Sequence, residues 1–203
     1  MSGLEFLLVT LVGYIVGSIP FAVMIGIFHG VDILQQGSGN PGATNVKRVI
    51  GKGAGYFCFV GDSMKGLLAA GWPQLHVFEM VSDPLRLAFV GLVAAVLGHS
   101  YSVFIRFKGG KGVATIIGGL FAIMTNVLLI SVVVWLIVFY ITRYVSFASI
   151  CLCLSLPLLA LICREPIEVI VLCLFFAIFI TLRHRSNIRR LISGTEDRMQ
   201  KET

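Results

Sequence analysis

The stretch VATIIGGLFAIMTNVLLISVVVWLIVFYI, residues 113–141, decides how this chain folds. As one continuous helix it would be roughly 43 Å long at about 1.5 Å per residue, whereas the hydrocarbon core of a bilayer is about 30 Å thick. A polar pair, Thr125-Asn126, stands near its middle. We therefore expect two short or re-entrant helices that turn at this pair, in place of one long helix.

Five further apolar runs approach the length that a membrane span needs, about 20 residues. They are Leu4–Phe28, Gly53–Trp72, Leu85–Phe104, Val145–Cys163 and Ile167–Leu182. The chain is 57% hydrophobic and 13% charged, with a mean hydropathy of +0.95, whereas a soluble domain carries about 25% charged residues. The sequence therefore predicts an all-α integral membrane protein. We expect residues 1–203 to form a single polytopic domain whose first run is a span and not a cleaved signal peptide.

The basic residues decide the expected orientation of the spans. With about seven transmembrane helices and the N-terminus outside, most of them fall in four cytoplasmic segments: 29–52, 105–112, 142–145 and the tail 183–203. Only Arg86 and Arg164 then lie outside. A single crossing by residues 113–141 would place the arginines of the tail outside, against the positive-inside tendency. We therefore expect seven spans and a cytoplasmic C-terminus.

Charge and cysteine usage exclude several kinds of site. The net charge of +6 is concentrated in short loops, which indicates topology and anion binding and not nucleic-acid binding. The five cysteines lie in or beside apolar runs without metal-ligand spacing, so we expect buried structural thiols. No HExxH or GxSxG motif is present. The sequence predicts no metal, no cofactor and no obligate protein partner. The lipid bilayer is the expected surroundings of the chain.

Two glycine-rich segments on the expected cytoplasmic side are candidates for binding anions. GSGNPGATN (residues 37–45) offers backbone N–H groups and the side chains of Ser38, Asn40, Thr44 and Asn45, followed by Arg48. FKGGKGVAT (residues 107–115) places Lys108 and Lys111 around Gly109, Gly110 and Gly112. It lacks the GxxxxGK[ST] spacing of a nucleotide-binding P-loop, so no nucleotide is implied. The alternatives are a flexible connector for the first segment and a basic interfacial anchor for the second.

Other polar residues have both a functional and a plain interpretation. The tail RHRSNIRRLISGTE (residues 183–196) is typical of a stop-transfer cluster, which does not account for His184, Asn187 or Glu196. Asp62 and Lys65 share a helix face at i,i+3 spacing and either pair with each other or serve the site. The remaining candidates at this membrane depth are His99, Arg143 and Ser146, for which helix-end hydrogen bonding or snorkelling is the plain explanation.

These motifs carry a resemblance to a known family. GSGNPGATN, DSMKG (62–66), GHSYSVFIRFKGGKGVAT (98–115) and RHRSNIRRL (183–191) resemble, in this order, the bacterial acyl-phosphate:glycerol-3-phosphate acyltransferases, the PlsY family. Ser102 departs from the family pattern, which often has proline there, and this difference concerns the local helix geometry. The resemblance implies transfer of a fatty acyl group from acyl phosphate to the 1-position of glycerol 3-phosphate, giving lysophosphatidic acid and phosphate.

The resemblance and the residue chemistry together give a hypothesis for the site. The expected catalytic residues are Ser38, Arg48, Lys108, His184 and Asn187. The expected substrate-binding residues are Asn40, Thr44, Asn45, Lys65, His99, Gly109, Gly110, Lys111, Gly112, Arg143, Ser146 and Glu196. Lys111, Lys108 and the glycines would hold one phosphate, and the Ser38 segment the other phosphate or the oxyanion. His184, Asn187 and Arg143 would orient the glycerol, while Glu196 braces the tail.

Two questions stay open at the level of sequence. The base for the glycerol hydroxyl is His99, His184 or the departing phosphate of the donor. The rival functions are a transporter of a phosphorylated metabolite, with the glycine loops as a gate, and a membrane scaffold. The transporter is disfavoured because the polar groups gather at one face and not at mid-depth, and the scaffold leaves the loops unexplained.

Overall fold

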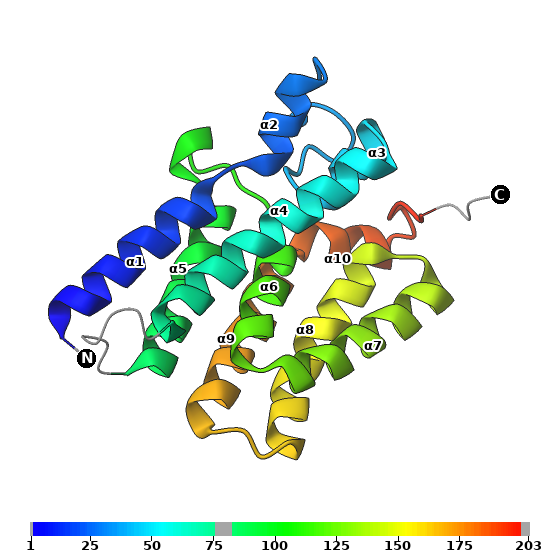
Figure 1. Cartoon of the computed structure of the whole chain (residues 1–203). Coiled ribbons are helices and arrows are strands. Elements are labelled where there is room, and N and C mark those ends of the chain that lie inside the picture. Colours follow the sequence, from blue (N-terminus) through cyan, green and yellow to red (C-terminus); the bar gives the residue numbers. More distant parts are fainter. Residues whose placement is uncertain (1, 76–82, 200–203) are drawn as a thin grey trace. The chain divides into compact units, whose positions relative to one another are not determined.

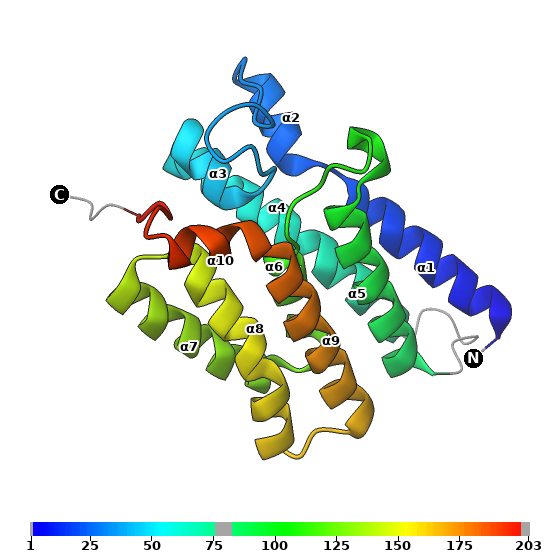
Figure 2. The same ribbon diagram turned by 180° about the vertical axis from the view of Figure 1, so that it is seen from behind.

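A computed structural model describes residues 2–75 and 83–199, and the regular structure in these ranges is helical (Figures 1 and 2). In chain order the helices are α1 (Gly3–Ser18), α2 (Phe21–Phe28), α3 (Ala43–Val49), α4 (Lys52–Gly71), η1 (Trp72–Gln74), α5 (Pro84–Ser100), η2 (Val103–Ile105), α6 (Val113–Ile123), α7 (Thr125–Thr142), α8 (Val145–Ile162), α9 (Ile167–Arg183) and α10 (Arg185–Ile192). The all-α class is thereby confirmed for the described residues. The chain forms two compact units, Met1–Ile123 (unit 1) and Met124–Thr203 (unit 2). The single domain over 1–203, whose last four residues lie outside the described ranges, stays a prediction.

In unit 1, helices α1, α4, α5 and α6 pack closely because small residues face one another (Figure 1). A Cβ atom added to Gly17 of α1 would collide with the backbone of Ala95 on α5. One added to Gly66 of α4 would collide with the carbonyl of Thr115 on α6. Helices in lipid gain little from apolar burial alone, so such close backbone approach supplies the packing that holds them together.

The first apolar run, Gly3–Phe28, has the length and apolarity of a membrane span, as the sequence predicts, but it is divided between two helices. Helix α1 ends at Ser18 and α2 begins at Phe21, because Pro20 has no N–H with which to continue the helical hydrogen bonds. Ile19 between them is extended, with φ −56° and ψ 117°. The break leaves backbone carbonyls at the end of α1 that side chains of other helices in unit 1 can reach.

The run 113–141 is two helices, as the sequence predicts. Helix α6 ends at Ile123 and α7 begins at Thr125, with Met124 between them at φ −151° and ψ 65°. The break thus lies one residue before the polar pair Thr125-Asn126. Asparagine favours the start of a helix over its interior, which is consistent with Asn126 lying in the first turn of α7.

Several helices have the length and apolarity of membrane spans. Within the described residues these are four stretches, or five if the bent pair α9 and α10 counts as one: Gly3–Phe28, Pro84–Ile105, Thr125–Thr142 and Val145–Ile162. Helix α4 is 20 residues long but carries Lys52, Asp62 and Lys65, and α6 has only 11 residues. Leu11, Leu136 and other large apolar side chains are more than half exposed, as expected of lipid-facing positions. The number seven and the orientation of the termini stay predictions.

In unit 2, helices α7, α8 and α9 pack against one another, and α10 turns away from α9 by 60° (Figure 2). The indole N–H of Trp135 donates to Ser149 Oγ at 3.3 Å between α7 and α8. Phe176 of α9 is fully buried. The bend at His184 places α10 across the ends of α8 and α9, so that its polar side chains meet the segment that follows it.

Candidate functional site

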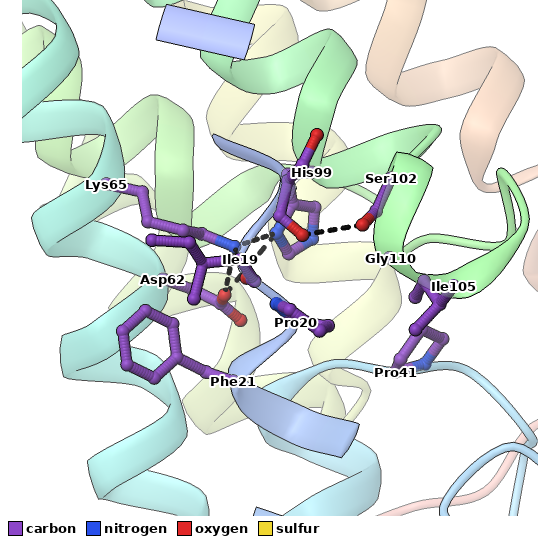
Figure 3. A pocket seen from close by; sticks show the side chains of 11 residues that line it. Ile19, Pro20, Phe21, Pro41, Asp62, Lys65, His99, Ser102, Ile105 and Gly110 are labelled. Carbon is purple, nitrogen blue, oxygen red and sulfur yellow. Dashed lines mark hydrogen bonds and ion pairs between the residues drawn. The ribbon is translucent and has the colours of Figure 1, made fainter. Parts of the chain in front are cut away.

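A buried charged cluster joins α4 to α5 in unit 1 (Figure 3). The ammonium of Lys65 lies 2.7 Å from Asp62 Oδ1, and His99 Nδ1 lies 3.1 Å from that ammonium and 3.4 Å from Asp62 Oδ1. Asp62 and Lys65 are each 3% exposed and His99 is 8% exposed. The pairing of Asp62 with Lys65 follows from their i,i+3 spacing, whereas His99 joins them only because α5 packs against α4.

A backbone carbonyl that sequence reasoning missed completes this cluster. Lys65 Nζ donates to the carbonyl oxygen of Ile19 at 2.8 Å, and that carbonyl is accessible because Pro20 breaks the first apolar run. The Phe21 ring lies 5.7 Å from the same ammonium. The signal for this contact in the sequence was Pro20 inside an apolar run, which indicates a helix break with exposed carbonyls.

The FKGGKG segment lies directly on His99. The backbone N–H of Gly110 donates to the His99 carbonyl at 3.1 Å. Cβ atoms on Gly109 and Gly110 would collide with His99 and Ser100, so these glycines permit close seating of the loop. Gly112 has a φ of +95°, a conformation that glycine adopts without strain. Lys108 is exposed and Lys111 is half-buried.

The two glycine-rich loops of unit 1 come together beside the charged cluster. A Cβ atom on Gly110 would lie 2.9 Å from the carbonyl oxygen of Pro41, which belongs to GSGNPGATN. Both residues line one pocket with Asp62, Lys65 and His99 (Figure 3). The remaining lining residues are Ser18, Ile19, Pro20, Phe21, Ser102 and Ile105. Two segments about 70 residues apart in the sequence, each predicted to bind an anion, are therefore neighbours.

Asn45 shapes the first glycine-rich loop from within. Its Oδ1 accepts from the N–H of Ser38 at 2.9 Å, and its Nδ2 donates to the carbonyls of Gln36 at 2.9 Å and Ile33 at 3.2 Å. Because both amide hydrogens are used inside the protein, the side chain of Asn45 braces the loop. Gly37, at φ +60°, passes so close to Asn45 Oδ1 that a Cβ atom there would collide.

The other predicted residues of this segment are more accessible. Ser38 and Arg48 are exposed, and Asn40 and Thr44 are half-buried. The bracing by Asn45 therefore presents the side chain of Ser38 at the surface of the loop, where a substrate can reach it.

Ser102, which departs from the family pattern, does not disturb the local geometry. Its φ of −66° is the value that proline would impose. Its hydroxyl donates to the carbonyl oxygen of Ser18 at 2.5 Å and is buried. Ser102 thus ties the end of α5 to the end of α1 beside the pocket, a contact between positions 84 residues apart that the sequence does not reveal.

The approach to Lys108 is conformationally strained. Arg106 and Phe107 are both left-handed, at φ 54° and φ 60°. Such backbone costs non-glycine residues about 1–3 kcal/mol each and persists only where the surroundings enforce it. Here the N–H of Phe107 donates to the Ser102 carbonyl at 2.8 Å, and that of Lys108 donates to the Ile105 carbonyl at 3.0 Å.

In unit 2, Glu196 is the centre of a second polar cluster. Its Oε1 accepts from Ser146 Oγ at 2.5 Å and from Asn187 Nδ2 at 2.6 Å, and its Oε2 accepts from Arg190 Nε at 2.7 Å. Burial favours the protonated carboxyl, but these hydrogen bonds and the Arg190 charge outweigh it and lower the pKa of Glu196 below its usual range. The tail is thereby fastened to the starts of α8 and α10.

The tail has two further contacts in unit 2. The N–H of Met199 donates to the Arg143 carbonyl at 3.0 Å, and Arg198 Nε donates to the hydroxyl of Tyr144 at 2.8 Å. The guanidinium of Arg143 lies over the ring of Tyr140 at 5.2 Å. Arg198 and Tyr144 were not among the predicted site residues.

His184 has a defined orientation at the bend between α9 and α10. Its Nδ1 lies 2.8 Å from the carbonyl oxygen of Ile180 and is buried. A carbonyl can only accept, so Nδ1 carries the proton, and Nε2 of a neutral His184 is the nitrogen that can take up another. This is the ring geometry of a general base or a hydrogen-bond acceptor.

This chain is similar to known proteins along nearly its whole length. The family model "Glycerol-3-phosphate acyltransferase" matches residues 7–194. The glycerol-3-phosphate acyltransferase of Aquifex aeolicus is 43% identical, covering 95% of this chain and 98% of its own. That of Carboxydothermus hydrogenoformans is 42% identical, covering 95% and 96%. The crystal structure of PlsY, an integral membrane glycerol 3-phosphate acyltransferase, in its glycerol 3-phosphate form has a TM-score of 0.88 at 40% identity, covering 96% of each chain.

Proposed function

Since this chain belongs to the glycerol-3-phosphate acyltransferase family, PlsY, we propose that it takes its acyl group from an acyl phosphate and places it on the 1-hydroxyl of glycerol 3-phosphate. The chain is an integral membrane acyltransferase whose reaction forms lysophosphatidic acid, a step of phospholipid synthesis. What the proposal adds is the donor, the position that is acylated, and the roles of individual residues.

The meeting of the two glycine-rich loops over one pocket carries this proposal. Acyl phosphate and glycerol 3-phosphate each bring a phosphate, so the reaction needs two anion sites close to each other. Gly110 of one loop and Pro41 of the other line the same pocket, and each loop has a nearby cation, Lys111 or Arg48. A protein that binds a single phosphate would need only one of these loops.

The reaction can proceed in one displacement. The glycerol oxygen attacks the carbonyl carbon of the acyl phosphate, the bond from that carbon to the phosphate oxygen breaks, and the hydroxyl proton ends on the released phosphate. Because acyl phosphate is already activated, no covalent enzyme intermediate is required, and the protein contributes positioning and donors to the developing oxyanion. Ser38, Arg48 and Lys108 are accessible enough for that work.

The unit 2 residues are assigned to the glycerol. Nε2 of His184 can accept the hydrogen of a glycerol hydroxyl, since Nδ1 is committed to the Ile180 carbonyl. Asn187, held through Nδ2 by Glu196, is assigned to the same moiety through its amide oxygen, which is an acceptor. In this proposal Ser146 and Glu196 hold Asn187 in place, and Arg143 supplies positive charge.

The proposal includes the expected topology: about seven spans, the N-terminus outside, and an active site that faces the cytoplasm of a bacterial plasma membrane. The basic residues of loops 29–52 and 105–112 and of the tail support it through the positive-inside tendency. A cytoplasmic site also suits a water-soluble acceptor such as glycerol 3-phosphate.

The test is product formation by purified protein in lipid, with labelled glycerol 3-phosphate and either palmitoyl phosphate or palmitoyl-CoA. Lysophosphatidic acid with the acyl phosphate alone is expected. Product with the thioester alone would overturn the donor, and flux into vesicles without product would favour a transporter. Arg48→Gln should lose activity, whereas the matched Arg164→Gln, at an exposed arginine between α8 and α9, should keep it.

A further inference from the structure

We propose that His99 is a fixed hydrogen-bond donor, through Nε2–H, to the phosphate bound at the FKGGKG loop, and that Lys65 and Asp62 are positioning residues that set its tautomer. The inference deepens the proposed function, because it rests on that loop holding a phosphate. It gives a role to the buried cluster of Asp62, Lys65 and His99, which takes no direct part in the acyl-transfer step.

Counting hydrogens fixes the state of the ring. The ammonium of Lys65 has three hydrogens and no lone pair, and three acceptors surround it. These are Asp62 Oδ1 at 2.7 Å, the Ile19 carbonyl at 2.8 Å and His99 Nδ1 at 3.1 Å. A proton on Nδ1 would point at the ammonium, so Nδ1 must be the acceptor. The single N–H of a neutral imidazole is then on Nε2.

The competing arrangement, an Nδ1–H that donates to Asp62, has weaker support. Asp62 Oδ1 is 3.4 Å from Nδ1, beyond the usual N–H···O range and farther than the lysine nitrogen. The other carboxylate oxygen, Oδ2, lies 3.6 Å from the thiol sulfur of Cys58, which can donate to it. Asp62 therefore satisfies Lys65 and Cys58 and does not require a proton from His99.

Nε2 of His99 faces the phosphate loop. A Cβ atom on Gly110 would collide with this nitrogen, so ring and loop backbone are in direct contact. The His99 carbonyl also accepts from the Gly110 N–H, which fixes the loop on the same residue from a second side. An N–H on Nε2 gives a phosphate at this loop one more hydrogen-bond donor, whereas a lone pair on Nε2 would repel the phosphate. This assignment removes His99 from the candidate bases.

The ring state can be measured without substrate. The chain has four histidines, so nitrogen-15 labelled histidine gives few signals, and the signal of His99 is the one lost in His99→Gln. In lipid nanodiscs the wild type should show an unprotonated Nδ1 and a protonated Nε2. Lys65→Met should shift the proton to Nδ1, where Asp62 can accept it. Nδ1–H or an imidazolium in the wild type would overturn the proposal, whatever the acyl donor proves to be.

Kinetics provide a second readout that a purely structural role would not give. Glutamine places an N–H donor near the ε position, whereas asparagine offers an acceptor near the δ position and no donor at ε. His99→Gln should stay within about tenfold of wild-type kcat/KM with an unaltered pH profile, and His99→Asn should fall by about 10²-fold or more, the usual cost of losing one such donor. The exposed His29→Gln is the control. An active His99→Asn beside an inactive, folded His99→Gln would contradict the donor role.

Discussion

Adding one methyl group at Gly110 should displace the FKGGKG loop. The new Cβ atom would lie 2.2 Å from His99 Nε2 and 2.9 Å from the Pro41 carbonyl oxygen. The histidine ring cannot easily move aside, because it is buried and bound to Lys65. Real Cβ atoms essentially never approach closer than 3.0 Å, so the loop must move by about 0.8 Å.

The size of the effect follows from this displacement. A misplacement of about 1 Å costs about 10²-fold in rate, or about 2.7 kcal/mol of transition-state stabilisation. Overpacking itself destabilises a fold by about 1–3 kcal/mol. We therefore expect Gly110→Ala to lower kcat/KM by about 10²-fold, with a higher KM for a phosphorylated substrate.

The assay is lysophosphatidic acid formation over a range of both substrate concentrations, with thermal unfolding of the same preparations. Gly53→Ala is the matched control, because Gly53 is in helix α4 with no heavy atom within 4 Å of the added Cβ and without a left-handed φ. It should keep wild-type kinetics and gain about 0.5–1 kcal/mol in stability. Wild-type kinetics in Gly110→Ala would refute both the seating of the loop on His99 and its place in the site.

Further expectations concern the supports of the two clusters. Ser102→Ala should lower the free energy of unfolding by about 1 kcal/mol, because it removes the hydrogen bond to the Ser18 carbonyl. Ser102→Pro should lower it by about the same amount, because the proline ring suits the φ of −66° and only the hydrogen bond is lost. Unfolding in mixed micelles measures both, and an unchanged stability would contradict the Ser18 contact. Asn45→Ala should raise the KM for a phosphorylated substrate at least about tenfold by loosening the Ser38 loop, and a wild-type KM would remove that brace. Lys65→Met should destabilise unit 1 by about 3–5 kcal/mol, since it leaves Asp62 buried without its cation, and adding Asp62→Asn should restore part of the loss. Because the pKa of Glu196 is lowered in the fold, its contribution to stability is complete above the ordinary pKa of 4.5 and is lost as the pH falls through the lowered pKa. A carbon-13 titration should show the Glu196 carboxyl still ionised below pH 4.5, and Glu196→Gln should remove its signal.

Local spacing accounts for what could be predicted of the site. Asp62 and Lys65 are one helical turn apart, so their pairing needs only a helix. The break before Thr125-Asn126 was predictable from helix length and bilayer thickness. The break at Pro20 was also present in the sequence, but the apolar run from Leu4 to Phe28 concealed it. These features depend on neighbours along the chain.

The sequence by itself determined that this chain is helical and lies in a membrane, because composition and run length leave no other solvent for so much apolar surface. It also indicated two glycine-rich loops as candidates for anion binding, since glycine with lysine or arginine is a local signal. Only the tertiary structure decided that Lys65 meets His99 and the Ile19 carbonyl, that Asn45 braces a loop, and that Gly110 lies against Pro41. Apart from the Asn45 brace, which spans 7 to 12 residues, those contacts join positions far apart in the chain. They arise from how closely glycine and alanine let particular helices approach, which periodicity along one segment does not specify.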